Sequence, residues 1–95
     1  MSDSIIQSEK KCYVTGVENG LHLHHVFRGS RRKHSDDYGL TVWLHHDVHR
    51  RLHDHSKPFE TLENDLKPIA QKAFEDNGGT RDDFRRIFGA NYLAD

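Results

Sequence analysis

The sequence predicts a small α+β domain in which a β-hairpin precedes three helices. Residues 21–27 and 40–44 are two short segments of strand character that lie close enough in the chain to pair. From residue 46 onward, apolar residues recur three and four positions apart, which is typical of helices packed on a core. With 95 residues, the chain is expected to form one domain, residues 1–95.

The N-terminal segment is expected to add little to this domain. Residues 1–8 are polar apart from two isoleucines, which predicts a disordered tail. Residues 12–14 have strand character, and Asn19-Gly20 then predicts a turn before the strand at residues 21–27. No run of apolar residues is long enough for a signal peptide or a membrane span, so we expect a cytoplasmic protein without a membrane partner.

The two predicted strands are separated by residues 28–39, which are polar and begin and end near glycines, so we expect a long loop there. The strand at residues 21–27 contains His24 and His25 in succession. Because successive side chains of a strand point to opposite faces, we expect these two imidazoles to have different neighbours.

Three helices are predicted in the rest of the chain. The first spans residues 46–54, with Val48 and Leu52 facing the core. The second and third form a helical extension over residues 58–95. The second opens at Thr61 and ends near residue 77, and Pro68 inside it predicts a kink or a split. Its apolar face is expected to consist of Leu62, Leu66, Ile69, Ala73 and Phe74.

The third predicted helix follows Thr80, whose hydroxyl is spaced to accept a hydrogen bond from the Asp83 amide. Phe84, Ile87 and Phe88 are expected to form its core face, and Gly89 is expected to end it, as glycine commonly does.

Charge and cysteine content narrow the function classes. The formal net charge is −1, so the chain as a whole is not a polycation. Four basic residues nevertheless fall within six positions without an acid among them: Arg28, Arg31, Arg32 and Lys33. Such a patch suits a phosphate backbone, although charge runs are also common in solvated loops. The single cysteine, Cys12, excludes an intramolecular disulfide and a four-cysteine zinc site, and it is expected to be a buried hydrophobe of the hairpin.

The chain contains nine histidines, and histidine is the commonest metal ligand. His49 and His53 are spaced to lie on one face of a helix, where two imidazoles converge on one divalent ion. Arg50 follows His49 where a zinc protease has glutamate, which removes that alternative. A third ligand is expected from the hairpin, which offers His24 and His25.

The arrangement of a His24-His25 pair ahead of a His49-x-x-x-His53 helix resembles the HNH, or ββα-metal (His-Me finger), endonuclease family over about residues 12–55. It is especially similar to the nuclease domain of the DNase colicins. The overall sequence, with GTRDDFRRIFGANYL near its C-terminus, also looks like small phage- and prophage-encoded HNH proteins. The resemblance implies a ββα-metal fold, in which residues 12–55 form the hairpin and metal-binding helix.

The resemblance also implies an activity, which is metal-dependent hydrolysis of DNA phosphodiester bonds, and it leads us to expect that a phage or prophage encodes the protein. His24, His49 and His53 would bind one divalent ion (zinc, nickel, magnesium or manganese), and His25 would act as general base. The residues that would hold DNA phosphates are Arg28, Arg31, Arg32, Lys33, Arg50 and Arg51.

Two departures from the family pattern keep alternatives open. Gly39-Leu40 stands where the family has an asparagine before an apolar strand, which favours a degenerate HNH module that binds DNA without cleaving it. The cysteine pairs that hold a structural zinc in many relatives are missing, so that second zinc is not expected. A third alternative is a structural zinc domain for protein contacts. Other histidines have alternative interpretations: His22 and His55 are possible further ligands, and His45 and His46 are expected to be cap or substrate-side residues.

Overall fold

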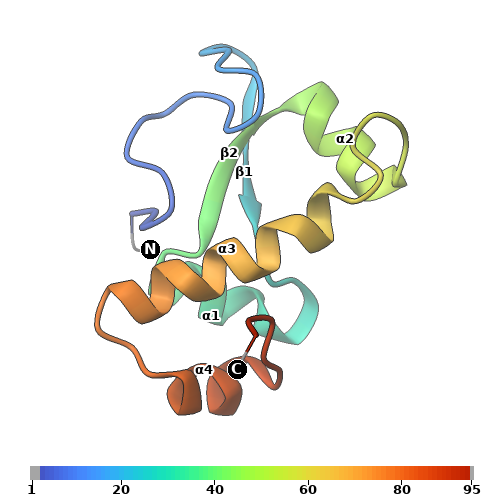
Figure 1. Ribbon diagram of the computed structural model, residues 1–95. Coiled ribbons are helices and arrows are strands. Elements are labelled where there is room, and N and C mark those ends of the chain that lie inside the picture. The colour runs from blue at the N-terminus through green and yellow to red at the C-terminus, as the bar shows by residue number, and fades with distance from the viewer. Residues whose placement is uncertain (1–2, 95) are drawn as a thin grey trace.

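The computed structural model describes residues 3–94 and is an α+β fold with a two-stranded antiparallel sheet and four α-helices in that part of the chain (Figure 1). The sheet stands at one end and α4 lies at the other, beneath α3 and α1. The elements in chain order are β1 (Leu21–His25), the short 3-10 helix η1 (Gly29–Arg31), α1 (Arg32–Tyr38), β2 (Thr41–His45), α2 (His46–Asp54), α3 (Leu62–Asp76) and α4 (Arg81–Phe88).

The predicted pairing of the two strands is confirmed. In the antiparallel register, His24 of β1 faces Val42 of β2, and His25 faces Thr41. The pairing continues past the strand ends, since the Val26 amide donates to the Leu40 carbonyl at 3.1 Å. This register places the two neighbouring histidines near the end of the sheet from which the connecting segment departs.

That connecting segment is a helix, so the prediction of a long loop over residues 28–39 is wrong. The buried Ser35 hydroxyl holds α1 against the end of β1, because it accepts from the Phe27 amide at 3.0 Å and donates to the Phe27 carbonyl at 2.9 Å. Gly39 then ends the helix in the left-handed conformation, with φ of 69°. The sequence did not predict this helix because RKHSDDY has almost no apolar face. The side chain that holds the helix in place, Ser35, is polar.

The predicted disordered tail is also wrong for residues 3–8, whereas the first two residues lie outside the described part of the chain. The Ile5 amide donates to the Gly39 carbonyl at 2.9 Å, and the side chain of Gln7 accepts from the Trp43 amide at 2.8 Å. This segment therefore covers the open edge of β2, whose backbone groups would otherwise be exposed for pairing with another chain.

The strand predicted at residues 12–14 is a turn instead. The Gly16 amide donates to the Cys12 carbonyl at 2.9 Å, and the Tyr13 amide reaches the Trp43 carbonyl at 2.8 Å. The prediction that Cys12 is buried holds, since only 1% of its surface is exposed.

The helix predicted at residues 46–54 is observed as α2, with Val48 and Leu52 buried as expected. In α3 the predicted split at Pro68 is wrong, because the helix runs unbroken from Leu62 to Asp76. A proline inside a helix removes one amide donor and crowds the carbonyl four residues earlier, and the packing of Leu66, Ala70 and Phe74 on the core offsets that cost. The predicted apolar face is shifted: Ile69 is 40% exposed, whereas Ala70 is buried.

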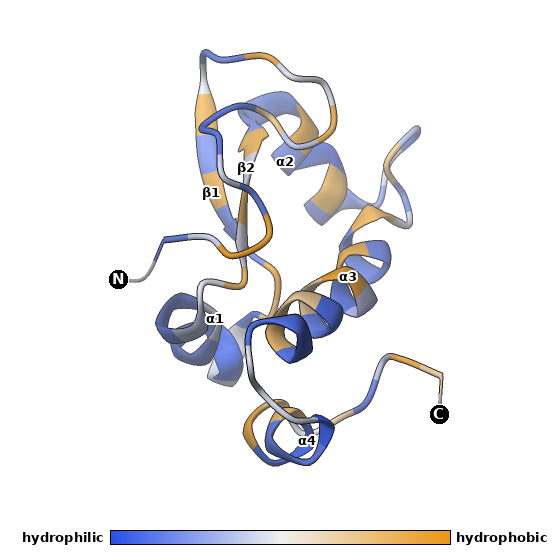
Figure 2. Ribbon diagram, turned by 60° about the vertical axis from the view of Figure 1, so that its left-hand side comes forward, coloured by the Kyte–Doolittle hydropathy of each residue, from blue (hydrophilic) through white to orange (hydrophobic). Residues whose placement is uncertain are grey.

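Helix α4 closes the lower part of the core. The Thr80 hydroxyl accepts from the Asp83 amide at 3.0 Å, as predicted, and Gly89 ends the helix in the left-handed conformation. Phe84 and Phe88 stack at 4.7 Å between ring centroids and meet Phe27 from the other side of the core. Figure 2 shows α1 as almost wholly hydrophilic, whereas hydrophobic and hydrophilic residues alternate along α2, α3 and α4. Among residues 3–94, no helix has the length and apolar character needed to cross a membrane.

We expect Ser35→Ala to lower the free energy of unfolding by about 1–3 kcal/mol, because it leaves the buried amide and carbonyl of Phe27 without their partner. Urea denaturation measures this change. Ser30→Ala is the matched control, since Ser30 is exposed, and it should stay close to wild type. Equal stability of the two variants would contradict the role assigned to the Ser35 hydroxyl.

Candidate metal centre

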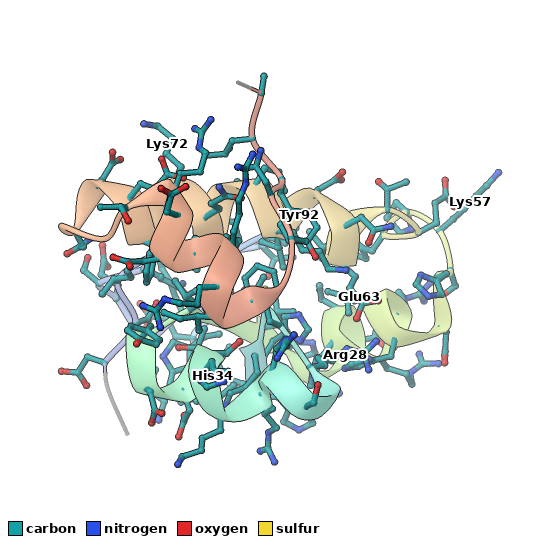
Figure 3. The ribbon with its side chains drawn as sticks, turned by 90° about the horizontal axis from the view of Figure 1, so that it is seen from below. Arg28, His34, Lys57, Glu63, Lys72 and Tyr92 are labelled. Carbon is teal, nitrogen blue, oxygen red and sulfur yellow. The ribbon has the colours of Figure 1, made fainter. Side chains whose placement is uncertain are left out.

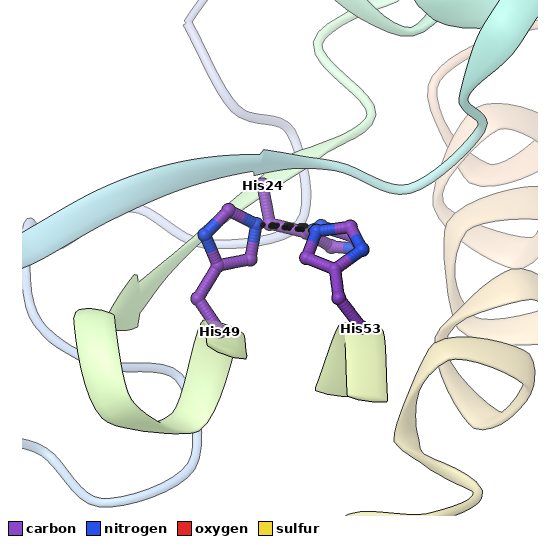
Figure 4. Close-up of side chains that lie close together, drawn as sticks. All are labelled: His24, His49 and His53. Carbon is purple, nitrogen blue, oxygen red and sulfur yellow. Dashed lines mark hydrogen bonds between the residues drawn. The ribbon is translucent and has the colours of Figure 1, made fainter. Parts of the chain in front are cut away.

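Three of the predicted ligands meet where α2 packs against β1. His24 comes from the strand, and His49 and His53 come from successive turns of the helix (Figure 4). The start of α2 is fixed by His45, whose side chain accepts from the Asp47 amide at 3.2 Å, so His45 is a cap residue. Strand alternation and helix periodicity together direct the three imidazoles into one space.

The spacing of the three imidazoles suits a tetrahedral ion. His24 Nδ1 lies 3.3 Å from His49 Nε2, and His49 Nε2 lies 3.0 Å from His53 Nε2. One nitrogen from each of the three residues lies within 4.8 Å of the others. Tetrahedral zinc with metal–nitrogen bonds of about 2.0–2.1 Å separates its ligand nitrogens by roughly 3.3–3.4 Å. Small shifts of the side chains would therefore complete the geometry.

The surroundings keep these imidazoles neutral, as metal ligation requires. Burial, followed by the nearby His49 and His53, lowers the pKa of His24 from 6.5 to about 3. Burial also lowers the pKa of His49 to about 4, with the charge of His53 as the next cause. The pKa of His53 is lowered too, first by burial and then by the positive charge of Arg28.

His24 is the buried member of the cluster, with only 1% of its surface exposed. Its Nδ1 faces the other two imidazoles, so an ion held there would leave the proton of the neutral ring on Nε2, which has no hydrogen-bond partner within residues 3–94. Three neutral imidazoles that converge on one space are a donor set that fits a divalent metal.

His25 points to the opposite face of β1 and has a different partner. Its Nε2 lies 3.2 Å from Oδ1 of Asp36, which α1 brings to the strand. The contact uses Nε2, so Nδ1 is the nitrogen that remains for a substrate. Sequence reasoning missed Asp36, because it lies in the segment that was predicted to be a loop.

A hollow of about 330 Å³ joins the two groups of histidines. It is lined by Leu23, His24, His25, Arg28, Gly29, Arg32, His49 and His53. A second hollow, of about 390 Å³, is lined by His25, Arg32, Lys33 and Asp36, and it shares two of these residues with the first. The three imidazole ligands, the fourth histidine and three basic side chains therefore border one continuous part of the surface.

The predicted basic residues divide into two groups. Arg28 and Arg32 line the hollow at the histidines, and Arg28 also forms an ion pair with the buried carboxylate of Glu63 on α3 (Figure 3). Lys33 lines the adjoining hollow. This group surrounds the candidate metal centre.

The second group lies outside the two hollows. Arg31 lies beside Gly89, where an added Cβ would come within 2.8 Å of its guanidinium. Arg50 and Arg51 both pair with Asp47 on α2, at 2.7 and 3.6 Å. These three arginines are not brought together with His25.

Of the other histidines, His22 has the most direct relation to the cluster. Its Nδ1 lies 3.3 Å from Nδ1 of His49. His46 stacks on His45 with 4.1 Å between ring centroids, and His55 ends α2 in the left-handed conformation. His34 contacts the ring of Phe88 at 6.0 Å, away from the metal centre.

Comparison with models of known protein families, with curated proteins and with solved structures found no match. The function of the chain must therefore be inferred from the geometry of its own side chains.

We expect acidification to destabilise the metal-free protein through His24. An unfolded histidine binds a proton near pH 6.5, whereas the folded His24 binds one only near pH 3. The unfolded chain therefore binds more protons between these values, and the free energy of unfolding falls as the pH falls through this window. Urea denaturation in chelator between pH 7 and pH 5 should show a smaller loss for His24→Asn than for wild type. An equal loss in both proteins would contradict this assignment, and His55→Asn is the control.

Proposed function

We propose that this protein is a metal-dependent endonuclease of the HNH, or ββα-metal, type that hydrolyses phosphodiester bonds in DNA. One observation supports the proposal above all. Three neutral imidazoles from β1 and α2 converge, and His25, which is also on β1, lies beside them but contacts Asp36 instead. A set of ligands next to an independent base is the arrangement that metal-assisted hydrolysis requires.

The proposed ligands are His24, His49 and His53. Three protein ligands leave coordination positions open, which distinguishes a catalytic site from a closed structural one. A divalent ion held there would supply Lewis-acid chemistry toward the phosphate and the leaving oxygen. Imidazole donors suit zinc and nickel, and magnesium and manganese are the other candidates in our proposal.

His25 is the proposed general base. Its Nδ1 takes a proton from a water molecule, the water oxygen attacks phosphorus, and the bond to the 3′ oxygen breaks. The leaving oxygen takes a proton from solvent, so the products are a 3′-hydroxyl and a 5′-phosphate. Asp36 at Nε2 keeps the ring oriented and stabilises the imidazolium that forms in this step.

Basic side chains next to His25 are suited to hold the DNA backbone. Arg32 borders both hollows and Lys33 borders the second, so we assign them the phosphates nearest the cleaved bond. Arg28 faces the metal centre but shares its charge with Glu63. We assign outer backbone contacts to the exposed Arg50 and to Arg31 and Arg51.

A DNA-binding module without cleavage is the second candidate, and Gly39 is the observation that favoured it. A side chain at this position does not fit, because a Cβ on Gly39 would collide with the carbonyl oxygen of Asp3. In the family, this asparagine helps to orient the catalytic imidazole. In this chain Asp36, which contacts His25, is placed to orient it instead. The reason to expect lost activity is therefore weaker. A structural zinc domain fits less well, because the cluster borders an open hollow.

The main test is the cleavage of supercoiled plasmid with added zinc, nickel, magnesium or manganese, with a chelator control. His25→Ala should lower the cleavage rate by about 10²–10⁴-fold, as expected for loss of a general base, while metal binding and the circular dichroism spectrum stay unchanged. His46→Ala is the control, since His46 is exposed and lines neither hollow.

Cleavage at the wild-type rate by His25→Ala would show that the base is wrongly assigned. Salt-sensitive DNA binding without cleavage by the wild-type protein, with every ion, would favour the degenerate module.

A second prediction concerns Asp36. Asp36→Asn should lower kcat by about tenfold or more, the effect typical of losing a residue that orients an active imidazole, with little change in KM or metal affinity. Asp37→Asn, its exposed neighbour on α1, serves as the matched control. If both variants cleave DNA with wild-type kcat, Asp36 has no part in orienting His25.

A further inference from the structure

His22 lies next to the candidate metal centre without being part of it. It is on the same face of β1 as His24, two residues away, and is exposed. Its ring meets that of His49 edge to face, with centroids 5.5 Å apart and planes at 82°. The closest approach is between the two Nδ1 atoms, at 3.3 Å. One of these nitrogens must carry a proton for this contact to be a hydrogen bond.

The chemistry of His49 decides which nitrogen carries that proton. A neutral imidazole has one N–H group and one lone pair. Nε2 of His49 is the nitrogen that faces His24 and His53, at 3.3 and 3.0 Å, so it must offer the lone pair to a metal. The N–H group of His49 must then be at Nδ1, where it donates to Nδ1 of His22.

The same contact makes His22 unsuitable as a ligand of the same ion. Nδ1 and Nε2 of one imidazole point in different directions, and His22 approaches His49 at Nδ1, whereas the cluster lies at Nε2. His22 also does not belong to the group of histidines whose nitrogens lie within 4.8 Å of one another. Its position is that of a partner to a ligand.

We propose that His22 is a positioning residue, which holds His49 in the tautomer that presents Nε2 to the metal. The inference rests on the proposed metal centre and adds a residue to it. Without an acceptor at Nδ1, His49 would also populate the form with its proton on Nε2, and that form cannot bind an ion. Residues that accept a hydrogen bond from a ligating histidine typically change metal affinity by about 10–100-fold. Because His22 is exposed, we expect the lower end of this range.

The test compares two substitutions of His22 in the full chain. His22→Leu removes the acceptor, whereas His22→Gln keeps an oxygen that can accept from Nδ1 of His49. Zinc affinity is measured by competition with a chromophoric chelator, and the tautomer of His49 is read in the metal-free protein from ¹⁵N NMR shifts. His46→Leu is the matched control, because its ring lies 6.2 Å from that of His22 and it forms no contact with His49 in the described chain.

We expect His22→Leu to lower zinc affinity by about tenfold and to give His49 a mixture of tautomers. His22→Gln should restore both the affinity and the Nδ1–H form, and His46→Leu should match wild type. A merely structural role of His22 would not change the tautomer of His49.

Three other results would overturn the inference. Wild-type affinity and tautomer in His22→Leu would remove any role for His22, while leaving the metal centre intact. Complete loss of zinc binding in both His22 variants, with the fold retained, would identify His22 as a direct ligand. If the wild-type protein binds no zinc, nickel, manganese or magnesium, the proposed metal centre itself fails.

Discussion

The burial of His24 between β1 and α2 is the constraint on which the rest of the site depends. Burial keeps the imidazole neutral, with its pKa at about 3, and the packing of α2 on β1 places Nδ1 against His49. Helix periodicity then adds His53 one turn later. The charges of His49 and His53 lower the pKa of His24, and the charge of His53 lowers the pKa of His49, in addition to burial. The cluster therefore offers neutral imidazoles with free lone pairs at neutral pH.

The second half of the site depends on α1, which connects the two strands. Ser35 joins this helix to the end of β1, and the next residue, Asp36, reaches His25. Because strand alternation turns His25 away from the cluster, a neighbour on the other face of β1 is needed to orient it, and α1 supplies that neighbour. Arg32 and Lys33 come from the first turn of the same helix, so one short element provides both the partner of His25 and the basic surface beside it.

Much of this arrangement could be predicted from residue spacing, and the rest depends on contacts that leave no periodic pattern. The interval of four between His49 and His53 predicted their shared face, and the same interval between Val48 and Leu52 predicted the face of α2 that packs on the core. Helix α1 is fixed by one buried hydroxyl and a left-handed glycine, and neither gives an apolar repeat. Asp36 was missed for that reason. Residues 3–8 bind Gly39 and the edge of β2 through the Ile5 amide and through the side chains of Ser4 and Gln7, and such contacts leave no apolar pattern in the sequence.

The central claim is that three imidazole nitrogens share one divalent ion, and X-ray absorption spectroscopy of the zinc-loaded protein tests it most directly. The account predicts one zinc per chain, with a first coordination shell that includes three imidazoles at about 2.0–2.1 Å and the remaining positions filled by oxygen. The imidazole number should fall by one in His49→Ala and stay at three in His25→Ala. A shell with fewer than three imidazoles in the wild-type protein, or one that loses an imidazole in His25→Ala, would contradict it.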